Sequence, residues 1–147
     1  LDIESTAGTQ KANDAIAAAW IRIAFTARAL ALQSKGKHRT HTNEIVDEAL
    51  NRLATLRRAL HSPNRRTTDN DWDNFLLAQI AIVEVYAGRP GAVPPAKQLL
   101  EALRTSTNIA NRMAIAEQLD FMLAFSKKSD PHASALAQLR HLIASEK

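Results

Sequence analysis

The sequence has no cysteine, so disulfide bonds and every metal site or reaction that needs a thiolate are excluded. Only four of its 147 residues are glycine, and aromatic residues make up only 5% of the chain. Valine and isoleucine are also few, whereas β-strands are enriched in β-branched and aromatic side chains. The composition therefore argues against a β-rich fold. Alanine and leucine are abundant instead, and both favour helices.

The apolar residues recur at intervals of three and four along most of the chain, which is the period of amphipathic helices. Capping residues and Gly/Pro positions divide the chain into predicted helices over residues 9–34, 43–61, 70–87, 95–105 and 108–125, with a last one from 131. A strand over residues 80–85 competes with the third helix, but no second strand is available to pair with it. We predict an all-α single domain of five to six helices over residues 9–147, preceded by a flexible N-terminal arm, residues 1–8.

Two architectures satisfy this pattern, an irregular helix bundle and stacked helical hairpins. An offset of 39 residues aligns apolar positions of the third and fourth predicted helices with those of the fifth and sixth. It places Ile80 on Leu119 and Leu100 on Leu139. Ordinary helix amphipathicity explains the same matches, so both architectures stay open at this point.

The stretch from Ala12 to Leu32 is the most apolar in the chain, and after residue 14 only Arg22, Thr26 and Arg28 interrupt it. Such a helix belongs inside a fold or inside a membrane. The two arginines would each cost roughly 2.5 to 3.5 kcal/mol in the hydrocarbon, so we expect no membrane span. We predict instead a buried central helix on which the other helices pack.

The chain shows no glycine-rich phosphate loop and no nucleophile with a suitably placed base. His38, His41 and Glu44 have the residue types of a metal site, but further ligands are missing there and we expect a solvated turn. The other three histidines, at residues 61, 132 and 141, lie near predicted helix ends, where we expect surface or capping roles. We therefore expect no metal, no cofactor and no enzymatic activity.

Asp120 falls beside an apolar face of its predicted helix. A carboxylate in such a place needs a partner, because an unpaired buried charge costs several kcal/mol. We expect Asp120 to pair with Arg112 or with an arginine of the first helix.

The net charge of +4 is concentrated in residues 35–66, which hold eight basic and three acidic residues. Lysine and arginine that neutralise phosphates supply most non-specific affinity for nucleic acids. The segment lacks aromatic residues for base stacking and lacks a helix-turn-helix spacing, so a solvated face or an acidic protein partner explains it as well. The candidate contacts to a partner or to phosphates are Lys35, Lys37, Arg39, Arg57, Arg58, Arg65 and Arg66.

These observations favour a protein-protein interaction module that belongs to a larger protein or assembly. We expect the chain, which begins with Leu1, to be a domain of a longer protein with a protein partner and a cytoplasmic location. The alternatives are a basic helical subunit that contacts the nucleic acid backbone and a small-molecule sensor domain. The oligomeric state is open.

Overall fold

The computed structural model describes residues 3–61, 70–106 and 108–144, with side chains described from residue 14 and, after the first gap, from residue 72. All regular structure in these residues is helical, so the predicted all-α fold class is confirmed. The helices are α1 (Ile3–Gln33), α2 (Gly36–Leu60), α3 (Asn70–Tyr86), α4 (Val93–Arg104), α5 (Ile109–Ala124) and α6 (Pro131–Ala144).

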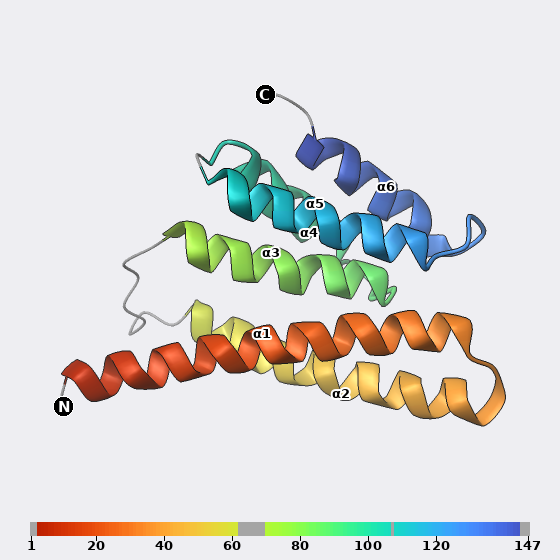
Figure 1. The fold of residues 1–147 in the computed structure, drawn as a ribbon, viewed down its shortest axis with the longest axis horizontal. Helices are drawn as coiled ribbons and strands as arrows, with labels where there is room; N and C mark the ends of the chain where they lie inside the picture. Colours follow the sequence, from red (N-terminus) through yellow and green to blue (C-terminus); the bar gives the residue numbers. More distant parts are fainter. Residues whose placement is uncertain (1–2, 62–69, 107, 145–147) are drawn as a thin grey trace.

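The helices pack as three antiparallel pairs, α1 with α2, α3 with α4 and α5 with α6, which are stacked on one another (Figure 1). α1, α3 and α5 run in the same direction and lie on the near side of the stack in this view. The two aligned pairs named above, Ile80 with Leu119 and Leu100 with Leu139, are fully buried in the second and third hairpins. The architecture is therefore that of stacked hairpins.

The central helix is α3, which contacts every other helix. Its side chains are buried on all sides toward its C-terminal end, at Leu76, Leu77, Ala78, Ile80, Ala81, Ile82, Val83, Val85 and Tyr86. The prediction that the stretch from Ala12 to Leu32 forms the central helix is wrong. α1 packs mainly on α2 and α3, and it leaves Ile16, Ile23 and Leu30 46%, 39% and 56% exposed. Two neighbouring helices, α2 and α3, are enough to cover the alanines on one side of α1. The larger apolar side chains of α3 point in all directions, so they are buried only if other helices surround α3.

Within the described residues, one stretch of α1, Asp14–Gln33, has the length and apolarity needed to cross a membrane. In this fold 33% of that stretch is buried, and its buried side faces α2 and α3. The apolar side chains on its outer side face away from the stack.

Most helix ends follow the predicted signals. Asn108 caps α5, accepting a hydrogen bond from the backbone N–H of Asn111 (3.1 Å). Gly36 has a φ of 61°, the left-handed conformation expected after α1. Three helices begin earlier than predicted: α1 at Ile3, α2 directly at Gly36 and α4 at Val93. The polar residues before position 43 are helical, and their hydroxyls are accommodated by bonds such as that of Thr42 to a carbonyl one turn earlier (2.6 Å).

Candidate functional site

A small hollow lies between α1, α3 and α5 on the face that these helices share, and we call it the front groove. It encloses about 160 Å³ and is lined by Ala18, Ile21, Arg22 and Phe25 of α1, Gln79 of α3 and Gln118 of α5. These three helices come from three different hairpins, so the groove exists only because the hairpins are stacked. Its wall residues are far apart in the sequence and share no motif.

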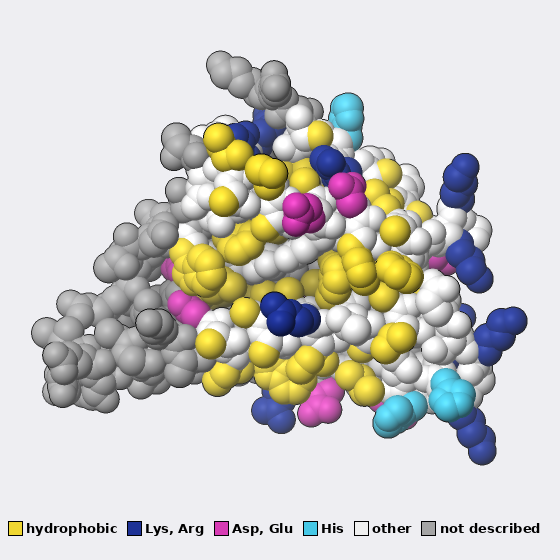
Figure 2. Space-filling model, in the orientation of Figure 1, with side chains coloured by type: hydrophobic (Ala, Val, Ile, Leu, Met, Phe, Trp, Pro, Cys, Tyr) yellow, Lys and Arg dark blue, Asp and Glu magenta, His cyan; other side chains and the backbone are white. Residues whose placement is uncertain are grey.

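Aromatic side chains lie beside the front groove, and Phe25 is one of the residues that line it. The ring of Phe25 stacks on that of Phe121 (4.4 Å between centroids), which in turn contacts the ring of Phe125 (4.7 Å). Toward the start of α3, Trp72 is exposed and its indole N–H donates to Asp14 (3.3 Å). Figure 2 shows large hydrophobic side chains on either side of a hollow on this face. The face therefore presents an apolar surface with aromatic rings held in place by their neighbours.

Two polar groups of the front groove are unsatisfied by the residues that the structure describes. The buried side-chain oxygen Oε1 of Gln118 accepts no hydrogen bond there. The exposed guanidinium of Arg22 likewise forms no ion pair with that part of the chain. Both groups can still bind a ligand: one accepts a hydrogen bond, and the other carries a positive charge.

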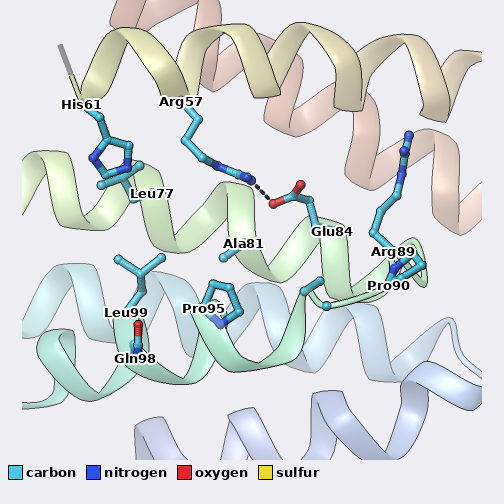
Figure 3. Close-up of a pocket in the computed structure, with 12 residues that line it drawn as sticks. Arg57, His61, Leu77, Ala81, Glu84, Arg89, Pro90, Pro95, Gln98 and Leu99 are labelled. Atoms are coloured by element: carbon cyan, nitrogen blue, oxygen red, sulfur yellow. Dashed lines mark hydrogen bonds and ion pairs between the residues drawn. The ribbon is translucent and has the colours of Figure 1, made fainter.

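A second hollow, which we call the rear cleft, opens on the opposite side between α2 and α4, over α3 (Figure 3). It encloses about 360 Å³. Its lining residues are Arg57 of α2 and His61 directly after it, Leu77, Ala81 and Glu84 of α3, residues 89–92 of the following turn, and Pro95, Gln98 and Leu99 of α4. The floor is thus largely apolar, with polar groups at the edges.

An ion pair between Arg57 and Glu84 crosses the rear cleft and joins α2 to α3. Both side chains are partly buried, and burial lowers the pKa of Arg57. On the rim, Arg89 lies 3.4 Å from Asp47. The turn that carries Arg89 has Gly88 in the left-handed region (φ 76°), a conformation that glycine adopts without strain. The cleft is therefore a shaped hollow whose charges are already paired.

A buried polar cluster joins the third hairpin to the first two. The hydroxyl of Ser126 donates to the carbonyl of Met122 (2.7 Å), so Nε2 of His132 is the donor in its 2.9 Å bond to the same hydroxyl. The His132 ring also packs edge-on against Tyr86 (5.4 Å, 80°). Burial raises the pKa of Tyr86 to about 12, and burial and Arg28 together lower the pKa of His132.

This cluster has residue types seen in nucleophilic sites but a different geometry. Asp130 lies 3.9 Å from Nε2 of His132, the same nitrogen that binds Ser126, whereas a catalytic triad places the acid on the other ring nitrogen. His132 is also only 5% exposed, so a substrate does not reach it. The expectation that His132 has a surface or capping role is wrong, because the packing of α6 on α3 encloses it.

The basic residues singled out from the sequence do not form one patch. Lys35, Lys37 and Arg39 are exposed at one end of α2, and Arg58 is exposed near the other end, roughly 30 Å away along the helix. Arg57 forms an ion pair with Glu84, so its charge is already paired. The remaining two candidates, residues 65 and 66, lie outside the residues that the structure describes.

The carboxylate of Asp120 is paired, as predicted, but its partner is different. It receives hydrogen bonds from Nε and a terminal nitrogen of Arg140 in α6 (2.7 and 3.3 Å). Asp120 points away from the core, where the antiparallel packing of α6 brings Arg140 beside it. His41 and Glu44 are both exposed, 3.9 Å apart, and in the described part of the chain no three His, Asp or Glu side chains converge as metal ligands do.

The aromatic residues of the front groove were missed as a site because the sequence places them in apolar helix faces. A signal for part of the site does exist in α5. Its buried stripe is Ile115, Leu119 and Met122, and both Phe121 and Phe125 fall on a neighbouring face, one turn apart. Two phenylalanines beside a complete buried stripe indicate a second apolar surface.

The fold and these surfaces define the class of protein as an all-α domain of three stacked helical hairpins. The sequence matches no protein-family model, and neither a curated protein nor a solved structure matches it significantly.

Proposed function

We propose that this domain is a protein-protein interaction module that binds a segment of another protein in the front groove. The observation that carries the proposal is the exposed aromatic surface beside the groove, where Phe121 and Phe125 continue from Phe25 of the lining. Contiguous exposed apolar surface is typical of interaction sites, and aromatic residues supply much of the binding energy at interfaces.

The geometry of the groove supports the same conclusion. The rings of Phe25 and Phe121 are stacked before any partner arrives, so little side-chain freedom remains to be lost on binding. Arg22 forms no ion pair and Oε1 of Gln118 no hydrogen bond with the described residues, so both add polar groups that select among partners. Among the described residues that line the groove, Arg22 is the only charged one, so the lining supports binding better than acid-base chemistry.

The test is a selection of peptides from a displayed random library on the immobilised domain. Replacing Phe121 by serine is expected to weaken the selected peptides about tenfold or more, because an aromatic anchor is lost. The matched control is Ile109→Ser, also an exposed apolar residue of α5 but outside the groove, which is expected to leave affinity nearly unchanged. Equal losses in both variants, or no selected peptide at all, would refute the proposal.

Binding to nucleic acid is the first alternative, supported by the exposed basic residues Lys35, Lys37 and Arg39 at the start of α2. Three neighbouring charges give weak, strongly salt-dependent affinity. Fluorescence anisotropy with labelled DNA and RNA at about 50 mM salt tests it. We expect no binding. Binding that falls steeply with added salt, and is lost when the three residues become glutamine, would favour this alternative.

Small-molecule binding in the rear cleft is the second alternative. Its volume of about 360 Å³ lies at the lower end of the range of ligand pockets, roughly 300 to 1,000 Å³. The apolar floor of Leu77 and Ala81 suits a small apolar body, but the charges around it are already paired. A thermal-shift screen of small organic acids would favour this alternative only if Ala81→Trp, which fills the floor, abolished the shift.

A further inference from the structure

We propose that the outer face of the first hairpin, formed by α1 and α2, binds to the surface of a lipid bilayer with anionic headgroups. The residues that carry this inference are Ile16, Ile23 and Leu30 of α1, which we call the outer stripe, and the basic residues at the turn between the two helices. The outer stripe lines neither the front groove nor the rear cleft, so the inference is independent of the proposed function.

The outer stripe is a straight row of large aliphatic side chains that the fold leaves uncovered. Ile16, Ile23 and Leu30 are all exposed, and they follow one another at intervals of seven residues. Seven residues are close to two helical turns, so the three side chains lie on one side of α1 and extend over roughly 20 Å. Single exposed apolar residues are ordinary, whereas a row of them marks a surface for interaction.

The second helix widens this apolar surface. Trp20 lies within four residues of both isoleucines of the stripe and is half-buried, with the guanidinium of Arg52 over its ring (5.7 Å). Ile45 is exposed on the same side of α2 as Arg52, since seven residues separate the two. Figure 2 shows hydrophobic side chains along the lower edge of the molecule, where the first hairpin lies. Tryptophan favours the boundary between water and lipid, so its place in this band suits a bilayer surface.

The charges that the turn end of the first hairpin leaves unpaired are positive. Residues 15–43 hold five basic residues and no acidic one. Lys35, Lys37 and Arg39 are exposed there and form no ion pair with the residues that the structure describes. The acidic residues of α2 instead lie beside basic side chains or histidine: Glu44 beside His41 (3.9 Å), Asp47 beside Arg89 (3.4 Å) and Glu48 beside Arg52 (3.8 Å). The free charge at the turn therefore complements an anionic surface.

A bilayer fits this face because it meets both features at once. Stable binding to a lipid surface takes two signals, and an apolar face with adjacent basic residues supplies them. The stretch Asp14–Gln33 has the apolarity of a membrane segment, but one side of it is buried against α2 and α3. Since that side stays within the fold, α1 lies along the bilayer surface and does not cross it. The first hairpin is at one end of the stack, so its outer face meets a flat surface without the other two hairpins intervening (Figure 1).

The experiment measures sedimentation of the complete chain with vesicles of phosphatidylcholine alone and with about 30% phosphatidylserine. We expect binding to the anionic vesicles only, weakened by added salt. Replacing Ile23 and Leu30 together by glutamine is expected to weaken binding about tenfold or more, because the apolar contact is lost without a change of charge. The matched control makes the same change at Ile109 and Met113, two exposed apolar residues of α5, and is expected to bind like the wild type.

Replacing the three basic residues at the turn by glutamine tests the second signal. Each basic residue near an anionic surface strengthens binding by a factor of about five, so the expected loss is roughly 100-fold. The matched control removes the same net charge elsewhere, at the exposed residues Lys97, Lys127 and Lys128. We expect this control to lose much less affinity, because its charges lie away from the bilayer.

Trp20 reports where the chain meets the lipid. Trp72→Phe leaves Trp20 as the only tryptophan, and vesicles with brominated lipid chains should then quench its fluorescence. Bound protein whose Trp20 is not quenched would contact the vesicle through another face, which contradicts the inference.

The other outcomes are as decisive. Absence of binding to anionic vesicles overturns the inference. Binding that needs the three basic residues but not Ile23 and Leu30 is a general attraction to polyanions, and it overturns the inference as well, as does an equal loss in the α5 control. A dimer in solution that dissociates when Ile23 and Leu30 become glutamine would assign the outer stripe to a second copy of the chain. Circular dichroism checks that each variant is folded, and the single variants Ile23→Gln and Leu30→Gln replace the double one if it is not.

Discussion

His132 shows how the packing of three hairpins changes the chemistry of a single side chain. Its ring is held by Ser126 and Tyr86, with Arg28 of α1 and Asp130 of the turn before α6 as the nearest charges. Burial lowers the pKa of the imidazole and Arg28 lowers it further, while Asp130 acts in the opposite direction. The neutral form is therefore the one that the folded state accommodates.

We predict that the domain loses stability as the pH falls below about 6.5. The pKa of His132 is near 6.5 in the unfolded chain and lower in the folded one, so the unfolded state binds more protons between these two values. The associated stability is complete above about pH 6.5 and is lost as the pH falls toward the folded pKa. Urea denaturation between pH 7.5 and 5 measures this loss. His132→Gln, which keeps a donor for Ser126, should flatten the profile, and an unchanged slope would contradict the assignment.

Arg57 is expected to matter for stability more than its neighbour Arg58. Replacing Arg57 by glutamine leaves Glu84 partly buried without its partner, and losing a hydrogen bond to a charged group costs about 1.5 to 3 kcal/mol. Arg58→Gln removes an exposed side chain and should change the free energy of unfolding by less than about 0.5 kcal/mol. Urea denaturation of both variants compares them. Equal effects would mean that the ion pair contributes nothing measurable.

At the scale of helices, burial separates α3 from α1 although both are strongly apolar. Ile80 of α3 is fully buried, and Ile23 of α1 is 39% exposed. We predict that Ile80→Ala costs about 2 to 5 kcal/mol, the range for truncating a buried aliphatic side chain. The same change at Ile23 should cost less than about 1 kcal/mol, because no cavity forms. Denaturant unfolding of the pair measures the difference, and a larger loss at Ile23 would make α1 the central helix after all.

The extent of most helices was predictable because their ends are set by local chemistry. The cap at Asn108 and the left-handed Gly36 act on residues next to them in the sequence, where they can be recognised. Which helix lies at the centre was not predictable in the same way. The apolar residues of α1 and α3 are equally conspicuous in the sequence, and only contacts between distant segments decide which of them are covered.

The front groove was beyond prediction for the same reason. Phe25, Gln79 and Gln118 lie in three helices and come together only when the hairpins stack. Asp120 illustrates the limit at one residue: its need for a partner was foreseen, but its partner Arg140 depends on how α6 lies against α5. The local sequence shows that a charged side chain beside an apolar face needs a partner. Which residue becomes that partner depends on the fold.

The molecule as a whole has one continuous buried core that includes side chains from all six helices. Arrays of repeats often unfold in parts, since each unit contacts only its neighbours. Here α3 contacts both the first and the third hairpin, which links the two ends of the stack.

We therefore predict a single cooperative unfolding transition. Tryptophan fluorescence reports on Trp20 and Trp72, in the first hairpin and α3, while far-ultraviolet circular dichroism reports on all helices. The two urea curves should coincide, which is a standard test of two-state behaviour. A dichroism curve with a separate transition would show that the third hairpin unfolds on its own.

The parallel course of α1, α3 and α5 places the N-terminal ends of all three helices at the same end of the front groove (Figure 1). The antiparallel helices α2, α4 and α6 pack directly against them, so the opposed peptide dipoles largely cancel over the whole stack. What distinguishes this face is its single backbone direction, because three helices side by side all run the same way. The two directions in which a partner's chain could lie along this face are therefore not equivalent.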